Sequence, residues 1–354
     1  MFRKGFVFVI GLWLIAYGIG IHPVEARKKR APKKKVMKEL VWPLPPAKPR
    51  LKWITQYQTV EDFTGESGLR RALRKLTGEK KKRLFVYPTA VVTDPQGRIY
   101  VSDTGGKRVV VLDPTKKKVR IWYGDPVGFT GPTGLAYARQ RHFLYVADSP
   151  ARAVYGVDMK GKIQLQIKEK LKRPAGLAID EQRHRLYVVD VRGHNIKVFD
   201  LDGKLLKVIG KRGNQPGEFN FPNFITVDSK GYLYVSDMGN FRVQILDPDG
   251  VVINTFGQPG KSPGDFMRPK GIAVDSENHI YVLDAFFHNL QIFDIFGRIY
   301  LAVGSPGREP GQFLLPIGVH IDEHNRVYIL DQLNRRLQIL EYLPSGEKAP
   351  GPEG

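Results

Sequence analysis

The sequence of 354 residues contains no cysteine, which excludes disulfide bonds, thiolate metal ligands and a lipid attached through a cysteine. It also contains no glycine-rich phosphate loop, no serine nucleophile elbow and no paired-carboxylate motif. Acidic residues are few, with 35 Asp and Glu against 56 Lys and Arg, so the formal net charge is +21. No local signature therefore indicates an enzyme class, and the excess of positive charge calls for an explanation.

That charge is concentrated in two short runs. Residues 27–38 hold eight Lys and Arg with no acid, and residues 70–83 hold eight more with Glu79 as the one acid. The runs carry fifteen of the 21 net charges, so the rest of the chain is only mildly basic. We expect an anionic partner to meet these runs, with a membrane surface as one such partner. Nucleic acid is not expected, because neither an aromatic stacking motif nor a base-reading helix is visible.

The N-terminus has the layout of an export signal. Arg3 and Lys4 precede an apolar run over residues 5–21, and "VEA" at 24–26 offers small residues around a cleavage point. This predicts a signal peptide over residues 1–26 and an exported protein of the periplasm or cell surface. An uncleaved membrane anchor remains open, because the basic run after the apolar stretch carries more charge than the residues before it.

The segments that follow differ in pattern. Residues 27–50 mix Lys with Pro and predict an extended tether, whereas residues 51–60 alternate like a single strand. Residues 67–78 predict a helix, which Ser67 caps and Gly78 ends. We expect its leucine stripe to pack on the folded domain with the charges in water, while docking on an anionic membrane is the alternative. The tail 344–354 has no pattern and is expected to be disordered.

One motif recurs six times in the remaining sequence. Four of the six copies open with Pro-x-Gly, and the other two have Ala90 or Phe224 in place of the glycine. An apolar run and an apolar-Tyr-apolar-x-Asp stretch follow, and the first five copies end in two further β-rich stretches. Four short strands per copy, with no helical insert, predict a propeller blade. The last copy stops after its third strand, near Leu340, and residues 51–60 can supply the fourth. We therefore predict an all-β fold over residues 51–343, a closed six-bladed β-propeller whose copies begin near residues 88, 132, 174, 222, 269 and 316.

The motif "PKGIAVDSENHIYVLD…LQIFD", which begins at Pro269 and recurs in register, resembles the NHL repeat. The resemblance implies a six-bladed propeller, but it does not name a function. Members of that family bind RNA or proteins in animals, and the peptide-amidating lyase carries metals in its central channel. Exported bacterial members act as extracellular sensor or interaction modules, some of them beside multihaem cytochromes.

The loops that join second to third strands should emerge at one mouth of the central channel. Four residues after the aspartate that ends each second strand, the sequence places cations, imidazoles and one aromatic ring. Such a ring would suit an anionic or aromatic ligand or an acidic loop, and loop tips in solvent are the alternative. The six residues are Lys107, Arg152, His194, Phe241, His288 and Arg335.

The aspartates themselves are expected to be structural, because a carboxylate at a turn accepts backbone N–H groups and an arginine five residues later can pair with it. They are Asp103, Asp148, Asp190, Asp237, Asp284 and Asp331.

Metal binding is an alternative that rests on three histidines. His194, His288 and His320 fall in different copies, and three imidazoles that met in a channel would make a zinc site. The spacing of these histidines in the sequence does not match a known metal-binding motif, so we predict no metal and no cofactor. Only under this alternative would Zn or Ca be bound in the central channel.

The sequence thus favours an exported, non-enzymatic propeller that binds a protein or an anionic envelope polymer, within an envelope or electron-transfer assembly. A metal-dependent lyase or hydrolase that uses the central channel, and an RNA-binding propeller, are the alternatives.

Overall fold

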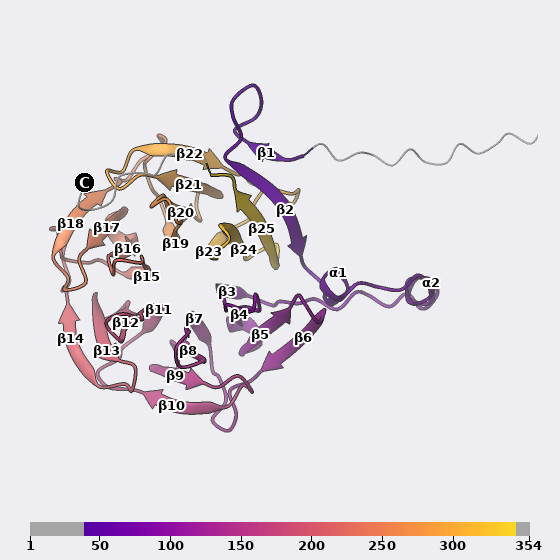
Figure 1. Ribbon diagram of the computed structural model, residues 1–354, viewed down its shortest axis with the longest axis horizontal. Helices are drawn as coiled ribbons and strands as arrows, with labels where there is room; N and C mark the ends of the chain where they lie inside the picture. The colour runs from indigo at the N-terminus through magenta and orange to yellow at the C-terminus, as the bar shows by residue number, and fades with distance from the viewer. Residues whose placement is uncertain (1–38, 345–354) are drawn as a thin grey trace, which may run out of the picture. The chain divides into compact units, whose positions relative to one another are not determined.

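The computed structural model describes residues 39–344, and the predicted signal peptide, the first half of the predicted tether and nearly all of the predicted tail lie outside them. The described residues form a ring of six sheets around a central axis (Figure 1). None of their helices is long and apolar enough to cross a membrane. The predicted six-bladed β-propeller is confirmed.

The first five blades are four-stranded antiparallel sheets whose strands follow the order of the sequence from the axis outward (Figure 1). Blade 1 holds β3 (Pro88–Thr93), β4 (Ile99–Asp103), β5 (Arg108–Asp113) and β6 (Lys118–Trp122). Blade 2 holds β7 (Pro132–Ala138), β8 (Phe143–Asp148), β9 (Ala153–Val157) and β10 (Ile163–Ile167). Blade 3 holds β11 (Pro174–Asp180), β12 (Arg185–Asp190), β13 (Asn195–Asp200) and β14 (Leu205–Ile209). Blade 4 holds β15 (Pro222–Val227), β16 (Leu233–Asp237), β17 (Arg242–Leu246) and β18 (Val252–Phe256). Blade 5 holds β19 (Pro269–Val274), β20 (Ile280–Asp284), β21 (Asn289–Phe293) and β22 (Ile299–Val303).

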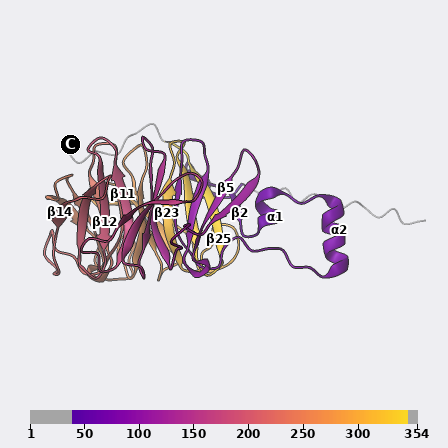
Figure 2. The same ribbon diagram turned by 90° about the horizontal axis from the view of Figure 1, so that it is seen from below.

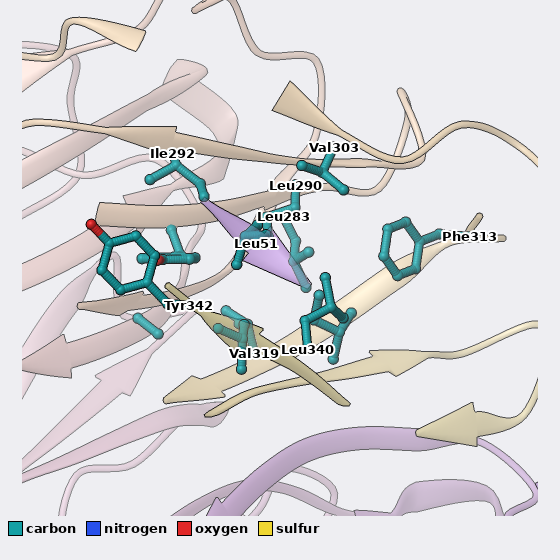
Figure 3. Packing of buried hydrophobic residues seen from close by; sticks show 13 residues of the cluster. Leu51, Leu283, Leu290, Ile292, Val303, Phe313, Val319, Leu340 and Tyr342 are labelled. Atoms are coloured by element: carbon teal, nitrogen blue, oxygen red, sulfur yellow. The ribbon is translucent and has the colours of Figure 1, made fainter. Parts of the chain in front are cut away.

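Blade 6 joins the two ends of the described chain. Its inner strands are β23 (Pro316–Ile321), β24 (Arg326–Asp331) and β25 (Arg336–Tyr342), and the N-terminal β2 (Leu51–Tyr57) pairs antiparallel with β25. A short strand that the sequence did not predict, β1 (Val41–Trp42), adds a fifth member outside β2. Leu51 is fully buried among Leu283, Leu290 and Leu340 (Figure 3), so side chains as well as backbone hydrogen bonds close the ring.

The segment between β2 and β3 carries two helices. The predicted strand ends at Tyr57 because Thr59 and Asp62 form a capping box that starts α1 (Val60–Thr64). The predicted helix is α2 (Gly68–Thr77), with the Ser67 side chain accepting a hydrogen bond from the backbone N–H of Arg70 and Gly78 ending it in a left-handed conformation. Two short 3₁₀ turns, η1 (Thr104–Gly106) and η2 (Met238–Asn240), follow second strands.

The repeated aspartates are structural, as expected. All six are fully buried at the ends of their second strands. In each blade the carboxylate accepts backbone N–H groups from the segment that leads into the innermost strand, as Asp103 does from Tyr87 at 2.6 Å. Arginines complete three of these sites, with Arg336 Nε 2.7 Å from Asp331 as one example. Each aspartate thus stabilises the segment that leads into the innermost strand of its own blade.

The Pro-x-Gly glycines allow the innermost strands to approach one another. A Cβ added to Gly318 of blade 6 would lie 2.6 Å from the carbonyl oxygen of Thr89 in blade 1, and one added to Gly271 would lie 2.7 Å from that of Ile317. Only a residue without a side chain fits such a contact with backbone. The glycine of the motif therefore packs neighbouring blades around the axis.

This packing predicts that Gly318→Ala destabilises the fold. The methyl group would force β23 away from β3, and we expect the free energy of unfolding to fall by about 1–3 kcal/mol in urea denaturation. Gly68→Ala is the matched control, because a Cβ there would have no atom within 4 Å and alanine favours a helix. Equal effects of the two substitutions would contradict the packing role.

Candidate functional site

The six residues predicted to ring the channel mouth occupy equivalent places in the structure. Each lies in the loop between the second and third strands of its blade, in the left-handed conformation with φ between 50° and 56°. Lys107, Arg152 and Arg335 are exposed, Phe241 and His288 are half-buried, and His194 is buried. Whether these six side chains bind a ligand stays a prediction.

The two imidazoles of that set have backbone partners. Nδ1 of His194 accepts a hydrogen bond from the N–H of Phe221 at 3.2 Å, and Nδ1 of His288 accepts one from the N–H of Leu315 at 2.9 Å. Each bond joins a blade to the residue just before the first proline of the next blade. Both histidines therefore stabilise contacts between blades 3 and 4 and between blades 5 and 6.

A cavity of about 220 Å³ lies at this same end of the channel, and we call it the mouth cavity. None of the six predicted residues lines it. Its walls come instead from the middle residue of Pro-x-Gly and from the first residue after the buried aspartate, such as Thr133 and Ser149. The side chains that give the cavity its chemistry are Arg173, Lys270, Phe221, Phe224, Thr89, Thr133, Ser149 and Asn223.

Lys270 is the unusual group of the mouth cavity. Its ammonium group donates to the Met238 thioether at 3.1 Å, and no carboxylate of residues 39–344 pairs with it. Burial, with smaller contributions from the positive charges of Arg268 and Arg173, lowers the pKa of Lys270 from 10.5 to about 8. The ammonium is therefore still mostly protonated at pH 7, although its surroundings disfavour the charge.

Arg173 adds a second positive charge to this cavity. Its backbone N–H donates to Asp190 at 2.7 Å, but its guanidinium has no ion-pair partner in the described part of the chain. The cavity lining contains no acidic side chain. A site with two cations, two phenylalanine rings and several hydroxyl groups is complementary to an anion that carries an apolar or aromatic body.

Two residues that line the mouth cavity differ in type from the residues at the equivalent position of the other copies. This difference is a sequence signal that could have revealed the cavity. Phe224 stands where four of the six copies have glycine, and it lines both the mouth cavity and the channel below it. Lys270 is the one charged residue in a column otherwise filled by Thr89, Thr133, Ala175, Asn223 and Ile317. Alignment of the six copies shows which positions are equivalent, whereas only the fold shows that these positions face the channel.

A second, smaller cavity of about 90 Å³ lies along the channel and is lined mainly by aliphatic residues of the innermost strands. His320 is the one imidazole that lines it, and Nε2 of His320 lies 2.9 Å from the Thr93 hydroxyl. Burial lowers the pKa of His320 from 6.5 to about 4, so this imidazole is neutral at pH 7.

The three candidate metal ligands thus have separate partners, namely Thr93 for His320 and two different backbone N–H groups for His194 and His288. Among residues 39–344 no three His, Cys, Asp or Glu side chains are grouped so that they could hold a metal ion.

Helix α2 does not pack on the propeller, so that expectation was wrong. Figures 1 and 2 both show it beyond the outer edge of the ring, and none of its residues is buried. Leu69 is 74% exposed, Leu73 52% and Leu76 83%, which leaves an apolar stripe without a partner in the described chain. Backbone bonds fix the base of this insertion, since the N–H of Val60 donates to Lys82 and the N–H of Leu84 donates to Gln58.

Comparisons with known families agree with this architecture. The model of the "SMP-30/Gluconolactonase/LRE-like region" matches residues 79–209 and 151–266, more than half of the chain in all, and the NHL repeat model matches residues 266–293. These matches fall on the blades whose motif resembles the NHL repeat. The chain belongs to the NHL-repeat propeller family.

Solved structures share the fold of this NHL propeller at low sequence identity. An auxiliary nutrient binding protein from Bacteroides thetaiotaomicron is 15% identical with a TM-score of 0.59, over 73% of this chain and 70% of that one. Virginiamycin B lyase from Staphylococcus aureus is 12% identical with a TM-score of 0.54, over 72% and 80%. Hydrazine synthase from Kuenenia stuttgartiensis is 14% identical with a TM-score of 0.52, over 71% and 94%. No curated protein matches the chain significantly.

Proposed function

We propose that this NHL propeller is a binding module that takes an anionic ligand with an apolar body into the mouth cavity. The observation that carries the proposal is the ammonium of Lys270, which is half-buried in the mouth cavity and has no anionic partner among the described residues. A buried charge without a partner costs free energy, and a bound anion would remove that cost. Arg173 supplies a second contact, while Phe221 and Phe224 cover the apolar part of the ligand.

A binding role suits the mouth better than catalysis. Its lining holds no imidazole or carboxylate, and Lys270, with a pKa of about 8, is mostly protonated at pH 7 and so suits holding an anion better than accepting a proton. Enzymes do occur on this fold, virginiamycin B lyase being one, but a likeness at 12% identity extends to the fold alone. The metal-dependent lyase or hydrolase therefore remains the alternative, with His320 as the side chain that such an enzyme would use inside the channel.

The proposed setting is the cell envelope. An export signal over residues 1–26 would deliver the protein there, and the basic runs at 27–38 and 70–83 suit an anionic surface. The exposed leucines of α2 supply an apolar stripe next to the second run, as docking at a membrane surface requires. A protein or an anionic envelope polymer is the partner that we propose for the channel mouth.

The pH dependence of anion binding tests the proposal. We expect benzoate, titrated calorimetrically into the full chain, to bind at pH 7 and to lose affinity above pH 8, because Lys270 deprotonates there and the ligand needs the protonated form. The loss should approach tenfold per pH unit. Lys270→Arg keeps its charge throughout this range.

That variant should therefore bind benzoate with little change between pH 7 and pH 9. Equal losses of affinity in the two proteins, or no loss in the wild type, would overturn the assignment of Lys270 as the anion contact.

A further inference from the structure

A third cavity lies where the two ends of the described chain meet, and we call it the seam pocket. It has a volume of about 280 Å³. One side comes from β2 and the segment after it, with Gln56, Gln58 and Arg83. The other side comes from blade 6, with Asn334 and Arg336, and from the loop that leads into it, with Arg308. It shares no residue with the mouth cavity. Closure of the ring thus creates a pocket that neither end of the chain could form alone.

Arg336 is a fixed wall of the seam pocket. Its Nε donates to Asp331 at 2.7 Å, its Nη1 donates to Oε1 of Gln56 at 2.7 Å, and its Nη2 donates to backbone carbonyl groups. Asp331 balances its charge, and only 3% of the residue is exposed. Arg336 therefore shapes the pocket and orients the Gln56 amide, but it has little capacity left for a ligand.

Arg83 and Arg308 are in the opposite situation. Both are exposed residues that line the seam pocket from its solvent side, and neither guanidinium has a hydrogen-bond or ion-pair partner within residues 39–344. The Nε2 group of Gln56 is also unengaged in that part of the chain, because the one bond of this side chain uses its oxygen. No acidic side chain lines the pocket. Two positive charges and an amide donor therefore face one polar cavity.

We propose that the seam pocket binds a phosphate group. Each guanidinium can donate two parallel hydrogen bonds to phosphate oxygens, and a dianion balances two arginines where a carboxylate would leave one charge unmatched. The volume exceeds that of a phosphate ion, so the pocket also has room for a small alcohol carrying the phosphate. Because both sides of the seam contribute, the bound group would link β2 and its following segment to blade 6.

Thermal unfolding of the full chain tests this inference. We expect the melting temperature to rise with the logarithm of inorganic phosphate concentration at constant ionic strength, since the ligand binds only the folded state. The double variant Arg83→Gln, Arg308→Gln should lose the rise. The control Arg120→Gln, Arg192→Gln removes the same charge from exposed sites and should keep it. Lys270→Met should keep it too, which separates this site from the mouth cavity.

Two results would overturn the inference, namely an equal rise with chloride or a rise that survives in the Arg83, Arg308 double variant. Calorimetry distinguishes the sources of the phosphate group. Tighter binding of glycerol 1-phosphate than of inorganic phosphate would indicate a phosphate carried on a larger molecule, while equal or weaker binding would indicate free phosphate.

Discussion

Replacing Lys270 with methionine is expected to stabilise the propeller while it abolishes anion binding at the mouth cavity. The ammonium is half-buried without an anionic partner in the described chain, and its lowered pKa shows that the charged form costs free energy in the unliganded protein. Methionine has a similar shape and suits the neighbouring Met238 thioether. We expect the free energy of unfolding to rise by about 1–3 kcal/mol, measured by urea denaturation at pH 7.

The sign of this effect follows from the pKa. The folded-state pKa of Lys270 is lowered from 10.5 to about 8, so the unfolded chain binds more protons between these pH values. The wild type therefore gains stability from this group as pH rises from 8 to 10.5, and the advantage of the methionine variant should shrink over the same range. Lys116→Met removes an exposed charge and should change neither stability nor benzoate binding. A destabilised Lys270→Met protein would contradict the unpaired-cation assignment.

Truncating Leu51 to alanine is expected to produce the largest loss of stability. Leu51 is fully buried between blades 5 and 6, and it lies on the strand that closes the ring (Figure 3). Loss of a buried leucine side chain costs about 2–5 kcal/mol, because the cavity left behind collapses only in part. We expect β25 to lose hydrogen-exchange protection before β12, since unpairing of β2 exposes one edge of blade 6.

Ile54 gives the matched control on the same strand. It is 41% exposed, so Ile54→Ala should change the free energy of unfolding by less than about 1 kcal/mol. If Leu51→Ala were as mild as Ile54→Ala, or if all blades lost protection together, closure by β2 would not be a separate weak point of the ring.

The fold could be predicted closely because its determinants are repeated in register. The Pro-x-Gly motif requires a close approach of inner strands, and Gly318 against Thr89 shows that the same contact joins the last blade to the first. One aspartate at the end of each second strand accepts hydrogen bonds from the segment that leads into its blade, as Asp103 does from the N–H of Tyr87 in blade 1. Residues 51–60 were predicted to hold the closing strand because an incomplete last copy needs one partner and alternation marks that segment as a strand, and the strand itself covers Leu51–Tyr57.

The candidate site was harder to predict because it depends on exceptions to the repeat. A pattern taken from all six copies does not show Lys270 or Phe224, because each occurs in one copy alone. Both residues line the mouth cavity, and their role depends on that environment. Position along the loops placed His194 and His288 at the mouth end, but it could not show that their Nδ1 atoms accept backbone N–H groups of the next blade. Side-chain direction and burial depend on neighbours that are distant in sequence.

By itself the sequence determined the number of blades, the strand that closes them and the caps of α2, because local hydrogen bonding and strand alternation fix these features. Only the tertiary structure decided that the leucines of α2 stay exposed, that Lys270 lies half-buried in the mouth cavity, and that Arg83 and Arg308 line one pocket at the seam. Whether a charge or an apolar side chain has a partner depends on segments brought together by ring closure, and no local pattern records that.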